Sequence, residues 1–126
     1  SGLTKLEREM IAVTVSSENH CFYCLVAHGS AVRELSNDPQ LGERIAANFR
    51  SAELPQKQFE LLNFTKKLTR DPSEITETDR KKLRDVGYTD RDIWDMSAII
   101  GLFNMTNRLA SATEMEPNNN YHNLAR

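Results

Sequence analysis

Apolar residues recur at intervals of three or four positions along most of this chain, and strand-like alternation is nearly absent. This spacing, together with only 5 glycines and 4 prolines, predicts an all-α fold. The length of 126 residues suits one domain, which we place at residues 3–126 after setting Ser1 and Gly2 aside as a linker or expression scar. We predict six helices, over residues 6–16, 20–34, 39–49, 55–69, 76–86 and 90–115.

Polar residues that favour helix ends separate these segments. Thr4 and Glu7 have the spacing of a capping box, in which each side chain accepts a hydrogen bond from the other residue's backbone amide. Ser17 or Asn19 is the predicted N-cap of the second helix, and Asp38 is that of the third. The second helix is therefore expected to have a C-x-x-C sequence at its start.

The last predicted helix is the longest, and apolar residues surround more of it than one core of this size can bury. Leu109 belongs to its apolar stripe, and Trp94 lies next to the stripe. We therefore expect a homo-oligomer. Asn104, Asn107 and Arg108 interrupt the stripe, and because buried polar groups need partners, we expect them to form interhelical or intersubunit hydrogen bonds.

The charge pattern argues against several classes of partner. The net charge is −2 and no basic patch stands out, so we expect no nucleic-acid partner. No apolar run is long enough to span a bilayer, and no signal-peptide pattern precedes the first helix. Two cysteines three residues apart gain little as a structural disulfide, because closing so short a loop removes little chain entropy. We therefore expect a cytoplasmic protein without a membrane partner, in which C-x-x-C is a redox pair or half a metal site.

Both cysteines, two of the three histidines and a carboxylate lie within residues 9–28. Cys21, Cys24 and His28 fall at positions i, i+3 and i+7, which share one face of an α-helix. If the first two helices fold back on each other, the Glu9 carboxylate lies close to the His28 ring. A thiol pair, a base and a carboxylate that orients the base are the components of a redox or nucleophilic site.

These four residues suit thiol oxidation chemistry. A thiol reacts with a peroxide only as the thiolate, which the free N–H groups in the first turn of a helix stabilise. Cys24 is one turn beyond the predicted cap, so it needs a further activator, and His28 is placed to accept its proton. Glu9 would fix the tautomer of His28 and stabilise its charged form. Oxidation of one thiol to a sulfenic acid, followed by attack of the other thiol, then closes a disulfide.

Two other interpretations of the same residues stay open on spacing alone. Cys21, Cys24 and His28, with His20 or Glu9 as a fourth ligand, have donor atoms that suit zinc. The cysteines also fit an inert helical core, because free cysteine is often buried. The two interpretations differ from the redox pair in predicting a bound metal or no chemistry at all.

The four residues match the E-x(11)-C-x-x-C-x(3)-H signature, and the chain resembles the AhpD-like alkylhydroperoxidases of the carboxymuconolactone decarboxylase superfamily. The segment EREMIAVTVSSENHCFYCLVAHG is especially similar to the peroxidase-related subgroup, whose members usually carry additional helices before the first one found here. The similarity continues through TDRDIWDMSAIIGLFNMTNRLA and the YHNLAR tail, so it covers nearly the whole chain. It implies an AhpD-like multihelical fold that assembles as a trimer or a hexamer.

The resemblance implies an antioxidant oxidoreductase, a thiol-dependent peroxidase that reduces hydroperoxides through a dithiol–disulfide cycle. Carried onto this chain, Cys24 attacks the peroxide, Cys21 resolves the product, and His28 with Glu9 relays protons. A dithiol reductant, thioredoxin-like or lipoyl, is expected to restore the thiols. With this resemblance we favour the redox pair over zinc and over an inert core, and we expect neither a metal nor a cofactor.

One departure from the family pattern bears on activity. The best-known members have a histidine between the two cysteines, where this chain has Tyr23. A phenol donates a hydrogen bond but is a poor base at neutral pH, so we expect a weaker proton relay. Tyr23 and His20 are therefore auxiliary candidates only. The alternative functions are a redox-sensing or oligomeric binding module with weak peroxidase activity, or other chemistry of the superfamily.

Overall fold

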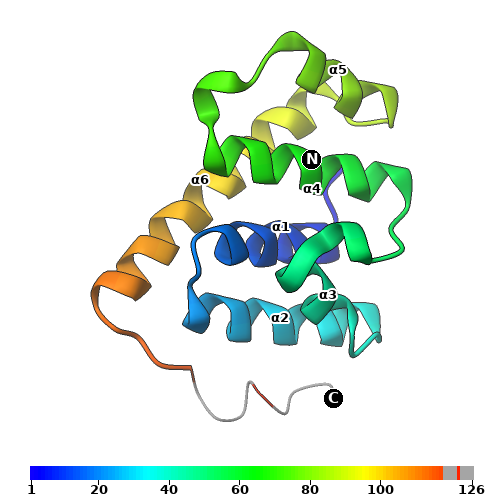
Figure 1. The fold of residues 1–126 in the computed structure, drawn as a ribbon. Coiled ribbons are helices and arrows are strands. Elements are labelled where there is room, and N and C mark those ends of the chain that lie inside the picture. Colours follow the sequence, from blue (N-terminus) through cyan, green and yellow to red (C-terminus); the bar gives the residue numbers. More distant parts are fainter. Residues whose placement is uncertain (118–121, 123–126) are drawn as a thin grey trace.

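The computed structural model describes residues 1–117 and 122, and these residues form helices and loops without a strand. Within them, six α-helices follow the predicted order, with two short 3₁₀ helices added (Figure 1). The elements are α1 (Lys5–Glu18), α2 (Phe22–Ser36), α3 (Leu41–Asn48), η1 (Phe49–Ser51), α4 (Gln56–Arg70), η2 (Pro72–Glu74), α5 (Glu77–Asp85) and α6 (Asp90–Ala112). The predicted all-α class is confirmed, and none of the described helices is long and apolar enough to cross a membrane.

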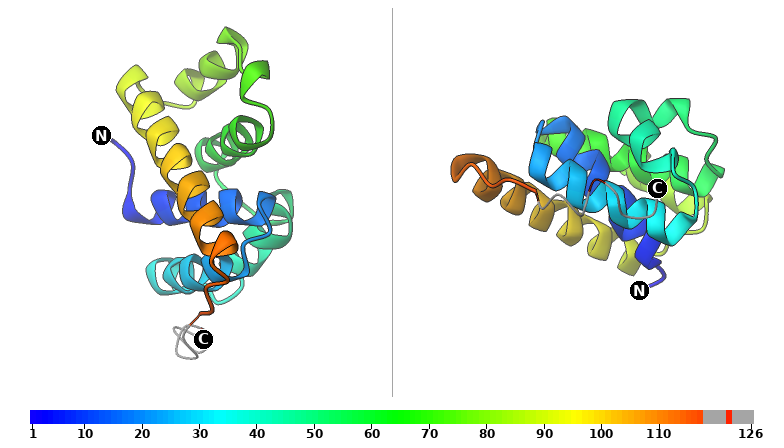
Figure 2. Two further views of the ribbon diagram at one scale, coloured as in Figure 1. Left: turned by 90° about the vertical axis from the view of Figure 1, so that its left-hand side faces the viewer. Right: turned by 90° about the horizontal axis from the view of Figure 1, so that it is seen from below.

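Helix α1 is the centre of the molecule. It lies between α2 and α4, α3 packs on it as well, and α6 crosses beside it (Figures 1 and 2). The sequence predicts a single apolar stripe on this helix, but every residue from Met10 to Ser16 is at most 3% exposed. Because neighbours cover α1 on all sides, its polar residues must find partners inside the protein. Thr14 Oγ1 accordingly donates to the Met10 carbonyl at 3.0 Å.

The predicted capping box at the start of α1 is present. Thr4 Oγ1 accepts a hydrogen bond from the Glu7 amide at 3.0 Å, and Glu7 Oε1 accepts one from the Thr4 amide at 3.0 Å. The second carboxylate oxygen of Glu7 accepts from the buried Tyr88 phenol at 2.5 Å. Burial, and then the Glu7 carboxylate, raise the pKa of Tyr88 well above its ordinary value of 10.0. This contact ties the start of α1 to the loop between α5 and α6.

The predicted start of the third helix is wrong by two residues. Asp38 does not cap a helix that begins at Pro39, because α3 begins at Leu41 with Gln40 as its N-cap. Asp38 Oδ1 instead accepts a hydrogen bond from the Gln40 amide at 2.9 Å. An aspartate side chain that reaches the backbone two residues ahead stabilises a turn, and this turn precedes α3.

Helix α6 departs from its predicted apolar stripe in the second half. Ile93, Met96 and Ile100 are buried, as the spacing predicts, and the helix ends at Ala112 instead of residue 115. Leu109, however, is 57% exposed. The reason is that α6 packs on the α1–α2 region through the face that carries Asn107 and Ala110. Leu109 lies outside that face.

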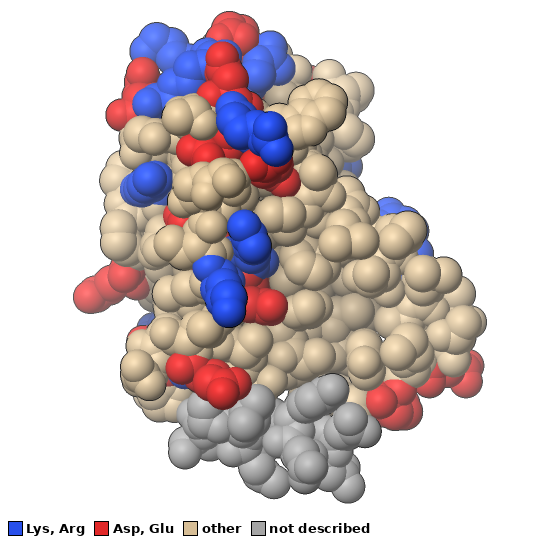
Figure 3. Space-filling model, turned by 180° about the vertical axis from the view of Figure 1, so that it is seen from behind, with Lys and Arg blue, Asp and Glu red and all other residues tan. Residues whose placement is uncertain are grey.

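Large apolar side chains remain on the surface of α6. Trp94, Leu102, Met105 and Leu109 are 75%, 49%, 53% and 57% exposed in the single chain. Figure 3 shows that charged side chains gather at the end of the molecule near α5, while a broad area of the same face has few charges. An apolar surface of this kind is typical of an interface with another protein chain.

Asp92 connects the N-terminal residues to α6. Its Oδ2 accepts a hydrogen bond from the Thr89 amide at 3.0 Å, and its Oδ1 accepts one from the Gly2 amide at 2.7 Å. The residues that we set aside as a linker or scar therefore contact the fold. These two backbone hydrogen bonds, from Thr89 first and Gly2 second, hold the pKa of Asp92 below its ordinary value of 3.8.

We predict that Asp92→Asn lowers the free energy of unfolding at pH 7 by about 1 kcal/mol, because asparagine has one acceptor oxygen where aspartate has two. The pKa of Asp92 is lower in the folded chain than in the unfolded chain. Its carboxylate therefore stabilises the fold fully at any pH above the pKa that Asp92 has in the unfolded chain. This contribution is lost as the pH falls through the pKa that Asp92 has in the folded chain. Urea unfolding between pH 7 and pH 2 should therefore show a smaller loss of stability on acidification for the variant, and equal pH dependence of both proteins would contradict the assignment.

Candidate active site

The candidate site begins at the junction between α1 and α2. We predicted that Ser17 or Asn19 caps a second helix that starts near His20, and this is wrong: α2 starts at Phe22, and Cys21 is its N-cap. Asn19 is instead the C-cap of α1. His20 has a left-handed φ of 53°, so the helical path is broken there and restarts only after Cys21.

Cys21 and Cys24 form a disulfide whose Cα atoms are 5.3 Å apart. Both side chains are almost completely buried, with exposed fractions of 2% for Cys21 and 3% for Cys24. Because α2 begins at Phe22, Cys24 is its third residue and lies within the first turn, closer to the helix start than the sequence suggests. The unpaired N–H groups of that turn are thus available to stabilise negative charge on either sulfur in the reduced protein.

His28 lies one helical turn beyond Cys24 and contacts Glu9 of α1. The distance from His28 Nδ1 to Glu9 Oε2 is 2.6 Å, which confirms the expected proximity of the carboxylate to the ring. The His28 ring also packs edge-on against Phe103 of α6, with ring centroids 5.0 Å apart. The side chains of His28 and Glu9 are 26% and 27% exposed, so this pair lies at the edge of the core.

The two auxiliary candidates differ in position. Tyr23 is half-buried and packs against the small cluster of Cys21, Cys24 and Ala110. His20 is exposed at the left-handed position of the junction. Tyr23 therefore contacts the cysteine cluster. Within the described part of the chain, no contact of His20 marks it as part of the site.

Helix α6 holds this junction through asparagine side chains. Asn19 Nδ2 donates to Asn104 Oδ1 at 2.9 Å and to Asn107 Oδ1 at 3.0 Å. Asn107 Nδ2 in turn donates to Ser16 Oγ at 3.1 Å. The expectation of interhelical hydrogen bonds is confirmed for Asn104 and Asn107, whereas Arg108 donates to Asn104 within α6 itself. Sequence reasoning assigned Asn19 to capping α2, and no local pattern marks it as a partner of α6.

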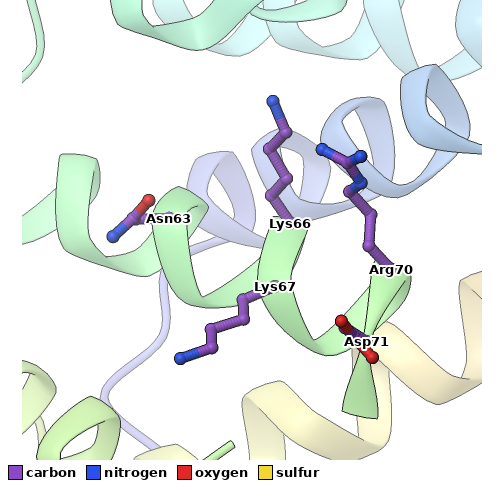
Figure 4. Close-up of a pocket in the computed structure, with 5 residues that line it drawn as sticks. All are labelled: Asn63, Lys66, Lys67, Arg70 and Asp71. Carbon is purple, nitrogen blue, oxygen red and sulfur yellow. The ribbon is translucent and has the colours of Figure 1, made fainter. Parts of the chain in front are cut away.

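A cleft of about 370 Å³ lies on α4, and none of the four predicted residues lines it. Figure 4 shows its lining residues, which are Asn63, Lys66, Lys67, Arg70 and Asp71. Lys66 and Arg70 lie 3.6 and 3.5 Å from carboxylate oxygens of Glu18, and Lys67 Nζ lies 2.9 Å from Asp79. Because each of these cations has an acidic partner, the cleft is not a strongly positive site.

The zinc interpretation gains no support from the geometry. Among residues 1–117 and 122, no three histidine, cysteine, aspartate or glutamate side chains converge in a way that would hold a metal ion. Both sulfur atoms, which would be the preferred zinc ligands, are bonded to each other.

Comparison with known proteins places this chain in a family. The model of the carboxymuconolactone decarboxylase family matches residues 1–55, a range that contains all four predicted site residues. A crystal structure of an uncharacterized peroxidase-related protein from Silicibacter sp. TM1040 is 60% identical and superposes with a TM-score of 0.98, over 100% of this chain and 66% of that one. No curated protein matches the sequence significantly.

A second solved structure comes from Ralstonia eutropha JMP134 and is described as an alkylhydroperoxidase AhpD core and an uncharacterized peroxidase-related protein. It is 40% identical, with a TM-score of 0.97, over 100% of this chain and 66% of that one. The present chain thus spans about two thirds of the length of both proteins.

The order of the six described helices, with C-x-x-C at the start of the second one, is that of the AhpD-like fold. The chain belongs to the AhpD-like group of the carboxymuconolactone decarboxylase superfamily.

We predict that the disulfide forms reversibly within one chain. Reduced, denatured protein should contain two thiols per chain, the number of its cysteines, and mild peroxide should remove both without intermolecular crosslinks. Thiol titration with non-reducing electrophoresis measures both quantities. Cys21→Ser is the control, because it has no partner for an internal disulfide; thiols that survive peroxide in the unaltered protein, or crosslinked dimers in place of the internal bond, would contradict a redox pair.

Proposed function

We propose that this protein is a thiol-dependent peroxidase that reduces hydroperoxides through a cycle of the Cys21–Cys24 pair. The observation that carries the proposal is the combination of two bonded sulfurs at the start of α2 with the His28–Glu9 contact one turn further along. A disulfide that spans so few residues contributes little to stability, so its presence favours a chemical role.

In the first step, the Cys24 thiolate attacks the terminal oxygen of a hydroperoxide ROOH. A sulfur–oxygen bond forms, the O–O bond breaks, and the leaving alkoxide takes up a proton to give ROH. Cys24 is thereby oxidised by two electrons to a sulfenic acid, and the peroxide is reduced by two. The position of Cys24 in the first turn of α2 supports this role, because the helix N-terminus stabilises the attacking thiolate.

In the second step, Cys21 attacks the sulfur of the Cys24 sulfenic acid. The S–S bond forms, the S–O bond breaks, and the hydroxide leaves as water with the proton of the Cys21 thiol. An external dithiol then transfers two electrons and two protons to the disulfide and restores both thiols. The Cα–Cα distance of 5.3 Å lies within the range that disulfides adopt, which supports Cys21 as the resolving residue.

His28 and Glu9 move the protons in this proposal. When Nδ1–H of His28 donates to the Glu9 carboxylate, the tautomer leaves Nε2 as the nitrogen that accepts a proton. His28 then takes the Cys24 proton before the attack and returns it to the alkoxide. Residues one turn apart on a helix have neighbouring side chains, which supports proton transfer between Cys24 and His28, directly or through water.

The comparisons support the same class of reaction. Both similar crystal structures are of proteins described as peroxidase-related, and one is described as an alkylhydroperoxidase core. We propose a hydroperoxide as the substrate and a dithiol, such as dihydrolipoamide or a thioredoxin-like protein, as the reductant. Such a reductant would work from inside the cell, in keeping with a cytoplasmic location.

The burial of both sulfurs supports a second candidate, a redox-sensing or oligomeric module with weak peroxidase activity. Cys21 and Cys24 are only 2% and 3% exposed, which limits the access of peroxides to the thiols. Tyr23 also packs on this pair where the best-known relatives have a histidine. In this case, opening and closing of the disulfide would alter the surface around α2 and α6 and, with it, assembly or partner binding.

For the peroxidase, we predict that Cys24→Ser abolishes consumption of tert-butyl hydroperoxide with dihydrolipoamide as reductant. Glu9→Gln should lower kcat/KM by about tenfold to a hundredfold, because the neutral amide stabilises the protonated imidazole less well. Glu34→Gln removes an exposed carboxylate from α2 and serves as the control with unchanged activity. If Cys24→Ser turns over peroxide as fast as the unaltered protein, Cys24 is not the attacking residue.

For assembly, we predict a homo-oligomer, a trimer or hexamer, in light scattering, because the exposed apolar residues of α6 favour contact with a second copy. Leu109→Glu should shift the measured mass toward the monomer, since it places a charge on that surface. Comparison of oxidised with reduced protein tests the redox-sensing candidate: identical masses in the two states argue against it, and a monomer in both states would refute the oligomer.

A further inference from the structure

Two hydrogen bonds hold the backbone of Cys21 between α1 and α2. The Cys21 amide donates to the Ser16 carbonyl at 3.0 Å, across the end of α1. The intervening residues, Asn19 and His20, return the chain toward α2, with His20 in the left-handed region. The Cys21 carbonyl accepts the first hydrogen bond of α2, from the Leu25 amide at 2.9 Å. The position of the Cys21 sulfur therefore depends on how firmly Ser16 and Asn19 are held.

Asn107 of α6 binds both of these residues. Its Oδ1 accepts from Asn19 Nδ2 at 3.0 Å, and its Nδ2 donates to Ser16 Oγ at 3.1 Å. The exposed fraction of Asn107 is 1% and that of Ser16 is 0%, so water cannot replace the contact between these two side chains. Ala110, one turn further along α6, belongs to the same buried cluster as both cysteines. One face of α6 thus touches the redox pair and the backbone that positions it.

We propose that Asn107 is a positioning residue for the redox pair: by clamping Ser16 and Asn19 it holds Cys21 within bonding reach of Cys24 in the reduced protein. The proposal deepens the proposed redox cycle, and it requires only that the cysteines interconvert between dithiol and disulfide. Two thiols that are held close together have a high effective concentration for each other, which favours the disulfide. A looser junction lowers this concentration and makes the disulfide easier to reduce.

The test is the redox equilibrium of the full chain with dithiothreitol. Reduced dithiothreitol gives two electrons and two protons to the disulfide, which becomes two thiols, and dithiothreitol closes to its cyclic disulfide. We expect Asn107→Ala to shift this equilibrium about tenfold toward the dithiol, equal to ~30 mV for a two-electron couple. Asn19→Ala removes the hydrogen bond between Asn19 and Asn107 from its half-buried end. This variant should shift the equilibrium in the same direction, and it provides the test if Asn107→Ala does not fold.

Thr65→Val is the matched control. Thr65 is a fully buried polar residue whose hydroxyl bonds to the Leu61 carbonyl within α4, so its loss affects stability without touching the junction. The control should leave the redox equilibrium unchanged. The double variant of Asn19 and Asn107 should shift it by less than the sum of the two single variants, because the two residues share one hydrogen bond and each also has a contact of its own.

Two results would overturn the proposal: an unchanged equilibrium in Asn19→Ala and in a folded Asn107→Ala, or an equal shift in Thr65→Val. Either result would leave the asparagine network with a purely structural role. The measurement uses no peroxide, so it separates this proposal from the proposed activity. A protein that fails to consume peroxide but shows the expected shift would keep Asn107 as the positioning residue and would lose only its peroxidase assignment.

Discussion

The packing of α2 along α1 is the constraint on which the rest of the site depends. Glu9 and His28 are distant in sequence, and their 2.6 Å contact exists because the chain reverses direction at Asn19 and His20 and returns along α1. Helix α1 is covered by α2, α3, α4 and α6, so it has little freedom to shift relative to them. A proton relay needs such rigidity, because proton transfer depends strongly on the distance between donor and acceptor.

The break in the helix between α1 and α2 has a chemical consequence. A continuous helix would leave both cysteines without nearby unpaired amides, whereas an N-cap at Cys21 puts both sulfurs at a helix start. The same break needs support from elsewhere, because a left-handed histidine and a short reversal are not favourable on their own. Asn104 and Asn107 of α6 supply that support through Asn19.

Helix α6 therefore has two different surfaces with different roles. One face contributes Phe103 to the His28 ring, Asn107 to the junction and Ala110 to the cysteine cluster. The other face leaves Leu102, Met105 and Leu109 exposed. Because both faces belong to one rigid helix, contacts with another copy on the outer face would be mechanically linked to the junction. This link gives the proposed oligomeric and redox roles a shared physical basis.

The sequence by itself determined the all-α class, the order of the helices and the capping box at Thr4. These features depend on local spacing, and side chains a fixed number of residues apart on a helix share a face in any fold. Tertiary structure alone decided that α2 starts at Phe22, that Asn19 turns toward α6, and that Leu109 remains exposed. Asparagine caps a helix or bonds to a distant one equally well, and only the presence of α6 beside the junction selects between these partners.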